Sequence, residues 1–149
     1  MTREELTEKI VAHKMLKGFK WADVAAQIDK SKEWTACALM GQLSLTKEQA
    51  EIVGNVIGLN FSEEEMGLLM SVPYRGSLPT QIPTDPLIYR FYEITQVFGS
   101  SIKSLIEEEF GDGIMSAIDF DMSIEREENP KGDRVVVTLS GKFLPYKSY

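Results

Sequence analysis

Cysteine and histidine are nearly missing from this sequence, and no residues form a long apolar run. A single cysteine, Cys37, excludes an intrachain disulfide. One histidine and one cysteine also leave no ligand spacing of the kind that zinc sites use, so we expect no metal site. His13, the only histidine, lies in a predicted N-terminal helix, far in sequence from the polar residues of the C-terminal half. We therefore expect it at the surface or half-buried, and not as a general base.

The sequence also has no excess of basic residues: 16 Lys and Arg stand against 23 Asp and Glu, which gives a formal net charge of −7. This charge argues against nucleic acid as the main partner, and an anionic substrate would have to be captured by local cations. No apolar run approaches the roughly 20 residues that cross a bilayer, and the acidic first residues do not resemble a targeting peptide. We expect a cytoplasmic protein without a membrane partner.

The N-terminal half shows five short helical patterns, several opened by a Ser or Thr with a Glu or Gln three residues later. They cover residues 4–17, 20–28, 31–40, 46–57 and 62–70. The compact second and third helices resemble a repressor-like helix-turn-helix domain. Lys and Arg for phosphate contacts are scarce there, so we favour a packing scaffold over a DNA reader. Trp21 and Trp34 are expected in the core or an interface, and Cys37 as a small buried filler.

A linker follows, because Pro73, Gly76, Pro79 and Pro83 stand close together. The predicted domains are therefore a helical domain at 1–75 and a second domain at 76–149. The second domain begins with a long helix from Pro86 to Gly111, capped by Thr84 or Asp85. Its apolar stripe, which we expect to face a core, consists of Leu87, Phe91, Ile94, Phe98, Ile102 and Leu105.

Three polar residues of this second domain are candidate site residues. Arg90 and Glu93 lie one helical turn apart at the edge of the stripe, where they can touch each other and a cleft. Ser116 follows in a strand whose alternation over 114–125 places it on the apolar face, where a buried hydroxyl needs a partner. The structural alternatives are a surface ion pair and a serine bonded to backbone, and from the residues alone these are the commoner cases.

A second strand is predicted from Arg134 to Leu139, across a turn at 128–133. One helix and one hairpin cannot enclose a core, so this domain must pair with another copy. The fold class is therefore α+β: an N-terminal five-helix repressor-like bundle, then a long helix and a β-hairpin that pair with those of another copy.

Three segments of the C-terminal half carry a family resemblance. DPLIYRFYE at 85–93, FGDGIMSAIDF at 110–120 and GKFLPYKSY at 141–149 are similar to the cyanases (cyanate hydratases). The sequence departs from the family at Phe98, where many members carry tyrosine, and at Tyr149, where phenylalanine is usual.

The resemblance implies a cofactor-free lyase that joins cyanate to bicarbonate, its co-substrate, and yields carbamate and carbon dioxide. It also implies that Arg90, Glu93 and Ser116 line the site, and that the chains assemble as a decamer of interlocked dimers. Helix length adds one expectation: Ser116 meets the Arg90 of another chain, because the turn is too short to bring it back to its own. The alternative function is a helix-turn-helix DNA-binding regulator with a C-terminal dimerisation domain.

Overall fold

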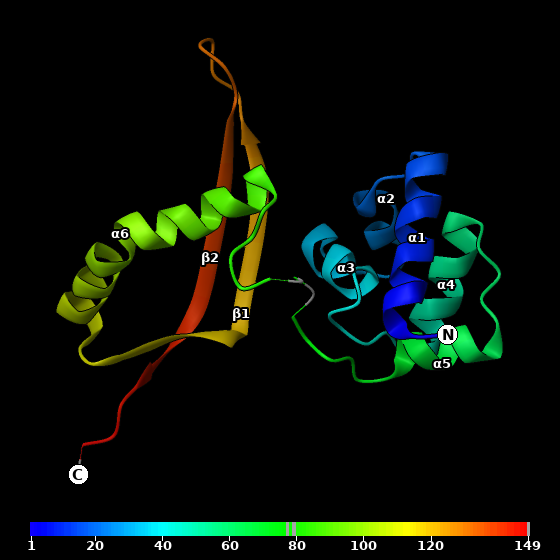
Figure 1. The fold of residues 1–149 in the computed structure, drawn as a ribbon, viewed down its shortest axis with the longest axis horizontal. Helices are drawn as coiled ribbons and strands as arrows, with labels where there is room; N and C mark the ends of the chain where they lie inside the picture. Colours follow the sequence, from blue (N-terminus) through cyan, green and yellow to red (C-terminus); the bar gives the residue numbers. More distant parts are fainter. Residues whose placement is uncertain (77, 79, 149) are drawn as a thin grey trace. The chain divides into compact units, whose positions relative to one another are not determined.

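Two units, Met1–Ser77 and Leu78–Tyr149, make up the computed structural model of the chain (Figure 1). The structure describes residues 1–76, 78 and 80–148. Pro79 of the predicted linker and Tyr149 of the C-terminal motif thus lie outside the described residues. The described residues between 71 and 85 form no helix or strand, as the linker prediction requires.

Five helices form the N-terminal unit, and capping residues explain where they begin. The helices are α1 (Arg3–Lys17), α2 (Trp21–Gln27), α3 (Lys32–Leu39), α4 (Lys47–Ile57) and α5 (Glu63–Met70). Thr2, Thr46 and Ser62 each accept a hydrogen bond from the amide three residues on, and that residue's Glu or Gln side chain accepts one from the cap amide. α1 and α4 end at Gly18 and Gly58, both in the left-handed conformation that glycine adopts without strain. The five predicted helices are confirmed.

All five helices contribute apolar side chains to one core. This core consists of Leu6, Ile10, Val24, Ile28, Ala38, Leu39, Leu45, Ala50, Val53, Ile57 and Leu69. Trp21 and Trp34 are partly buried against it, as expected of core aromatics. Cys37 is only partly buried, so the expectation of a buried filler is wrong for this residue. The N-terminal unit therefore has its own hydrophobic interior.

The second unit begins with α6 (Pro86–Phe110), a helix of 25 residues. Asp85 caps it, because its carboxylate accepts hydrogen bonds from the amides of Leu87 at 2.9 Å and Ile88 at 3.0 Å. The helix ends at Gly111, whose φ of 88° and ψ of −164° are essentially restricted to glycine. α6 is continuous but visibly bent (Figure 1). No helix among the described residues has the length and hydropathy needed to span a membrane.

After α6 the chain forms an antiparallel hairpin of β1 (Gly113–Glu127) and β2 (Arg134–Pro145). β2 extends past Leu139, where the predicted strand ended. In the outer part of the hairpin the register is regular, so that directly opposed residues share a face. One face is largely apolar, with the pairs Met122–Leu139, Ile124–Val137 and Arg126–Val135. The opposite face is mostly polar, with Asp121–Ser140, Ser123–Thr138, Glu125–Val136 and Glu127–Arg134.

A large bulge interrupts β1. Residues 116–119 stand opposite the single residue Lys142 of β2, so β1 carries three extra residues between Met115 and Phe120. The predicted alternation across 114–125 is wrong at this point, because extra residues break the period of two. Ile118, expected on the apolar face with Ser116, is 98% exposed.

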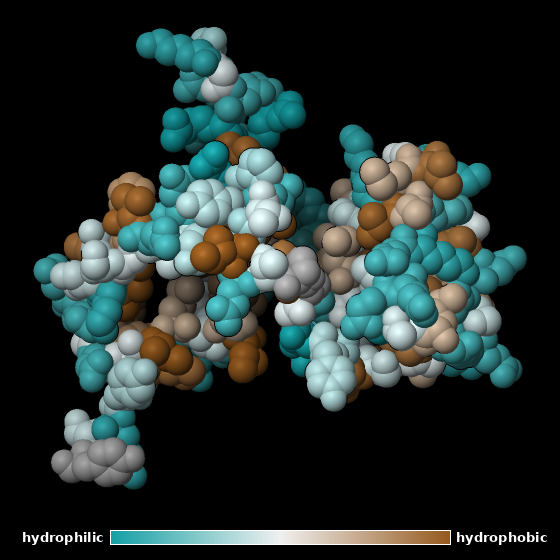
Figure 2. All heavy atoms as spheres, in the orientation of Figure 1, coloured by the Kyte–Doolittle hydropathy of each residue, from teal (hydrophilic) through white to brown (hydrophobic). Residues whose placement is uncertain are grey.

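The second unit buries very little of its apolar surface within one chain. Among its described residues only Pro83 and Ser116 are buried, and α6 contains no buried residue. The residues of the predicted stripe of α6 are 46–70% exposed, and Figure 2 shows apolar patches on the surface of this unit. The stripe therefore faces no core in a single chain. An apolar surface of this kind is typical of a protein interface.

Candidate active site

The second turn of α6 holds an ion pair. Arg90 Nη1 lies 2.9 Å from Glu93 Oε2, as the one-turn spacing predicts. The guanidinium carbon of Arg90 also lies 5.8 Å from the ring centroid of Tyr89, within the range of a cation–π contact. The two charged side chains are 60% and 47% exposed, so by itself the pair stabilises the helix by about 0.5 kcal/mol or less. The remaining N–H groups of Arg90 form no hydrogen bond to another described residue, which leaves them able to bind an anion.

Ser116 opens the bulge of β1 and is buried, with 6% of its surface exposed. Its hydroxyl oxygen accepts hydrogen bonds from the amides of Ile118 at 3.1 Å and Asp119 at 3.0 Å. The burial of Ser116 was expected, but its cause differs from the expected one. The bulge, not the alternation of a regular strand, places the hydroxyl.

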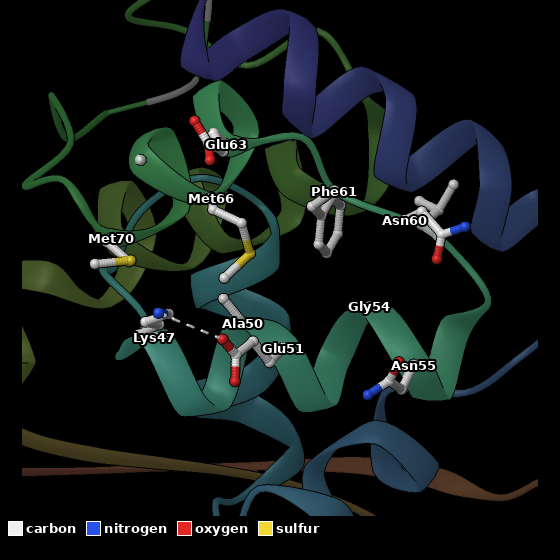
Figure 3. Close-up of a pocket in the computed structure, with 12 residues that line it drawn as sticks. Lys47, Ala50, Glu51, Gly54, Asn55, Asn60, Phe61, Glu63, Met66 and Met70 are labelled. Carbon is white, nitrogen blue, oxygen red and sulfur yellow. Dashed lines mark ion pairs between the residues drawn. The ribbon is translucent and has the colours of Figure 1, made fainter.

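The single chain does not join Ser116 to the charged pair. Among the described residues, no hydrogen bond or ion pair links Ser116 to Arg90 or Glu93. Arg90, Glu93 and Ser116 line neither of the two hollows described next. One groove of about 730 Å³ lies in the N-terminal unit between α4 and α5, with Phe61, Met66 and Met70 among its apolar lining (Figure 3). A second, mainly polar hollow lies at the hairpin tip.

His13 and Cys37, the single histidine and the single cysteine, are both partly buried. His13 Nε2 lies 2.7 Å from the carbonyl oxygen of Ile57, at the end of α4, and the residue is partly buried as expected. Burial raises the pKa of the Cys37 thiol above its ordinary value. In the described part of the chain, His, Cys, Asp and Glu side chains form no group of three or more that could hold a metal ion.

The helix-turn-helix surface offers few free cations for phosphate. At the start of α3, Lys32 Nζ lies 3.8 Å from Glu33 Oε1. The Lys30 ammonium lies 5.3 Å from the ring centroid of Trp34. Basic groups near α3, the second helix of the helix-turn-helix pair, thus already have partners within the chain, which weakens the DNA-binding alternative.

Sequence reasoning missed one residue that contacts the bulge. A Cβ on Gly141 would lie 2.2 Å from the carbonyl oxygen of Ser116, so β2 can pass the bulge only at a glycine. Gly141 opens the GKFLP segment, and an isolated glycine inside a strand pattern was the available signal.

Comparisons with known proteins agree on one class of enzyme, the cyanate lyases. Residues 3–73 match the family model described as "Cyanate hydratase, N-terminal", and residues 80–148 match "Cyanate lyase C-terminal domain". Cyanate hydratases of Methylibium petroleiphilum and Variovorax paradoxus are 62% and 59% identical to this chain, over its full length and theirs. A crystal structure of cyanase from T. urticae superposes with a TM-score of 0.79 at 38% identity, covering 95% of this chain and 97% of that one.

The chain belongs to the cyanate hydratase family. The predicted family, the α+β fold class and the predicted enzyme class are confirmed. The matched proteins give no support to the alternative of a DNA-binding regulator.

Proposed function

We propose that this enzyme of the cyanate hydratase family decomposes cyanate by joining it to bicarbonate, with Arg90, Glu93 and Ser116 as its site residues. The observation that carries the proposal is the ion pair of α6: the Arg90 guanidinium lies 2.9 Å from the Glu93 carboxylate in a chain with a net charge of −7.

Cyanate and bicarbonate need little covalent help to react. The carbon of cyanate is electrophilic, and an oxygen of bicarbonate is a nucleophile. Attack forms a C–O bond and a dianionic adduct, and loss of carbon dioxide with uptake of one proton leaves carbamate. The main obstacle is the meeting of two like charges. Binding both anions side by side also removes the entropy cost of their encounter, for which effective molarities of about 10⁵ M or more are known.

Arg90 supplies the charge that opposes this repulsion. A guanidinium presents a fixed fork of N–H donors that suits an oxyanion. Glu93 orients that fork and balances its charge while the site is empty, and we assign it this role in preference to direct proton transfer. Ser116 adds a hydroxyl from a buried position, where hydrogen bonds to developing charge are stronger than in water.

We further propose that the site is completed by a second copy of the chain. The second unit has almost no buried residue, and the stripe of α6 and one face of the hairpin expose apolar side chains. A second copy offers the matching surfaces, because the two partners of a two-fold interface present the same patch. Interlocked dimers built into a decamer, as the family resemblance implies, would cover these surfaces.

The test is cyanate consumption by the purified enzyme with and without added bicarbonate, followed by release of ammonia and carbon dioxide. We expect turnover that requires bicarbonate and persists in EDTA, because the sequence offers no His or Cys ligand set for a metal. Oxalate and malonate should compete, since a site shaped for a dianionic adduct binds its mimics tightly. Turnover indifferent to bicarbonate, or abolished by the chelator, would contradict the proposal.

A further inference from the structure

We propose that the bulge of β1 positions Ser116 as a hydrogen-bond donor to the anionic adduct, with Gly141 as the positioning residue that makes the bulge possible. This inference rests on the cyanate chemistry proposed above. In this arrangement the Ser116 hydroxyl donates its proton to the ligand. Gly141, which has no functional group, keeps the hydroxyl in place.

The direction follows from the hydrogen bonds that the serine already makes. A hydroxyl has two acceptor lone pairs and one O–H donor. The amides of Ile118 and Asp119, at 3.1 and 3.0 Å, occupy both lone pairs of Ser116 Oγ. The proton of Ser116 is therefore left to donate, and among the described residues no acceptor bonds to it. A buried donor needs such an acceptor, and the oxygen of an anionic ligand is one.

The same two amides strengthen the donor. N–H groups aimed at an oxygen draw electron density from its O–H bond, and chained hydrogen bonds reinforce one another in a low-dielectric environment. The hydroxyl also needs no reorientation when charge develops, because neighbours in its own strand fix its position. Interactions prepared in this way act on the transition state more than on the ground state.

Gly141 provides the space in which this geometry forms. A Cβ there would lie 2.2 Å from the carbonyl oxygen of Ser116 and 2.6 Å from Met115 Cγ. The methionine side chain can move aside, but the carbonyl belongs to the backbone of the bulge and cannot move alone. The φ angle of Gly141 is not in the left-handed region. The glycine therefore supplies room, not an unusual backbone conformation, and alanine would have to displace the residues that hold the serine.

Three variants test the coupling between the two residues: Gly141→Ala, Ser116→Ala and the double variant. Gly67→Ala is the control, because a Cβ at Gly67 meets no atom within 4 Å. We expect Gly141→Ala to lower kcat and kcat/KM together by at least about tenfold, and Gly67→Ala to leave both unchanged. Added to Ser116→Ala, the glycine substitution should cost less than about threefold more, since its effect passes through a serine already lost.

Two kinetic outcomes would overturn the proposal. If Gly141→Ala keeps wild-type kcat, the bulge does not depend on the glycine. If Gly141→Ala lowers the rate of Ser116→Ala as much as that of the wild type, its effect is a general distortion unrelated to the hydroxyl.

Amide hydrogen exchange provides a readout that does not depend on activity. In the assembled wild-type enzyme the amides of Ile118 and Asp119 should exchange slowly, and in Ser116→Ala at least about tenfold faster. Unchanged exchange in Ser116→Ala would refute the donor assignment even if Gly141→Ala fails to assemble. An inactive wild-type enzyme with protected amides would instead count against the proposed function alone.

Discussion

Mixing two severely impaired variants can decide whether Arg90 and Ser116 of one site come from different chains. Arg90→Leu and Ser116→Ala each remove one of the two groups. If the site lies within one chain, every chain in a mixture carries a defect and every site is defective. If it lies between chains, an intact arginine from one variant can meet an intact serine from the other.

Helix length favours the second arrangement. From Arg90 to Phe110, α6 runs without a break. At 1.5 Å per residue this segment is about 30 Å long. The six residues from Phe110 to Ser116 return at most about 20 Å even when fully extended. The bend of α6 shortens the span (Figure 1). No hydrogen bond among the described residues bridges the rest.

Two-fold symmetry sets the size of the expected recovery. Random pairing of equal amounts of the two variants makes about half of the dimers mixed, and each mixed dimer contains one intact and one doubly defective site. About one quarter of all sites should then be active, against almost none in either variant alone. The assay is bicarbonate-dependent cyanate loss after the chains are unfolded together and refolded, with the variants refolded separately as controls.

The refuting result is equally specific. If mass spectrometry proves that mixed oligomers form, and their activity stays at the level of the separate variants, the proposal that two chains share one site is wrong. A recovery well below one quarter, but above the controls, would indicate that each site uses two copies of one residue.

Three further predictions concern binding, assembly and stability. Arg90→Leu should lower kcat/KM at least about tenfold with an unchanged circular dichroism spectrum, whereas Arg90→Lys, which keeps the cation but not the fork of N–H donors, should retain part of the wild-type kcat/KM. If Arg90→Leu keeps more than about a tenth of the wild-type kcat/KM, Arg90 is only a surface ion-pair residue. Phe91→Glu on the apolar stripe should lower the oligomer mass measured by light scattering, while Gln96→Glu on the opposite face should leave it unchanged. Equal masses for the two variants would show that the stripe is not an interface. Glu65→Gln should lower the free energy of unfolding at pH 7 by about 1–3 kcal/mol, because Glu65 is buried and its carboxylate accepts a hydrogen bond from Lys9. That hydrogen bond lowers the pKa of Glu65 below its ordinary 4.5, so the carboxylate's contribution is complete above this value and is lost as pH falls through the lower folded pKa; a difference between the proteins that persists in strong acid would contradict this reasoning.

Local signals made much of the fold predictable. Capping pairs such as Thr46 with Gln49 define helix starts whatever the tertiary context. Asp85 followed by Pro86 marked the start of α6 in the same way, and the spacing within that helix predicted the Arg90–Glu93 ion pair. These features involve residues at most four positions apart, so the sequence displays them directly.

Features that depend on contacts between strands could not be predicted in this way. The pattern of apolar residues around Ser116 continues through the bulge as if β1 were regular. The bulge becomes evident only when the register against β2 is known, since its cause is a mismatch in residue number between two strands. The close approach of Gly141 to Ser116 depends on the same register. The length of β2 was underestimated for a related reason, because pairing with β1 continues to Pro145.

The N-terminal unit contains the buried core and the C-terminal unit contains the proposed site residues, and this division affects how variants should be interpreted. Apart from Pro83, the buried apolar side chains of the described residues all belong to the N-terminal unit. A substitution such as Leu6→Ala should therefore act on the stability of that unit, by about 2–5 kcal/mol, without touching the proposed site. In the C-terminal unit, stability and activity cannot be separated so easily. We propose that the same second copy of the chain covers its exposed apolar surfaces and completes the site. A change on the stripe of α6 should lower activity through assembly, whereas a change at Arg90, Glu93, Ser116 or the positioning residue Gly141 should lower it even in a fully assembled enzyme.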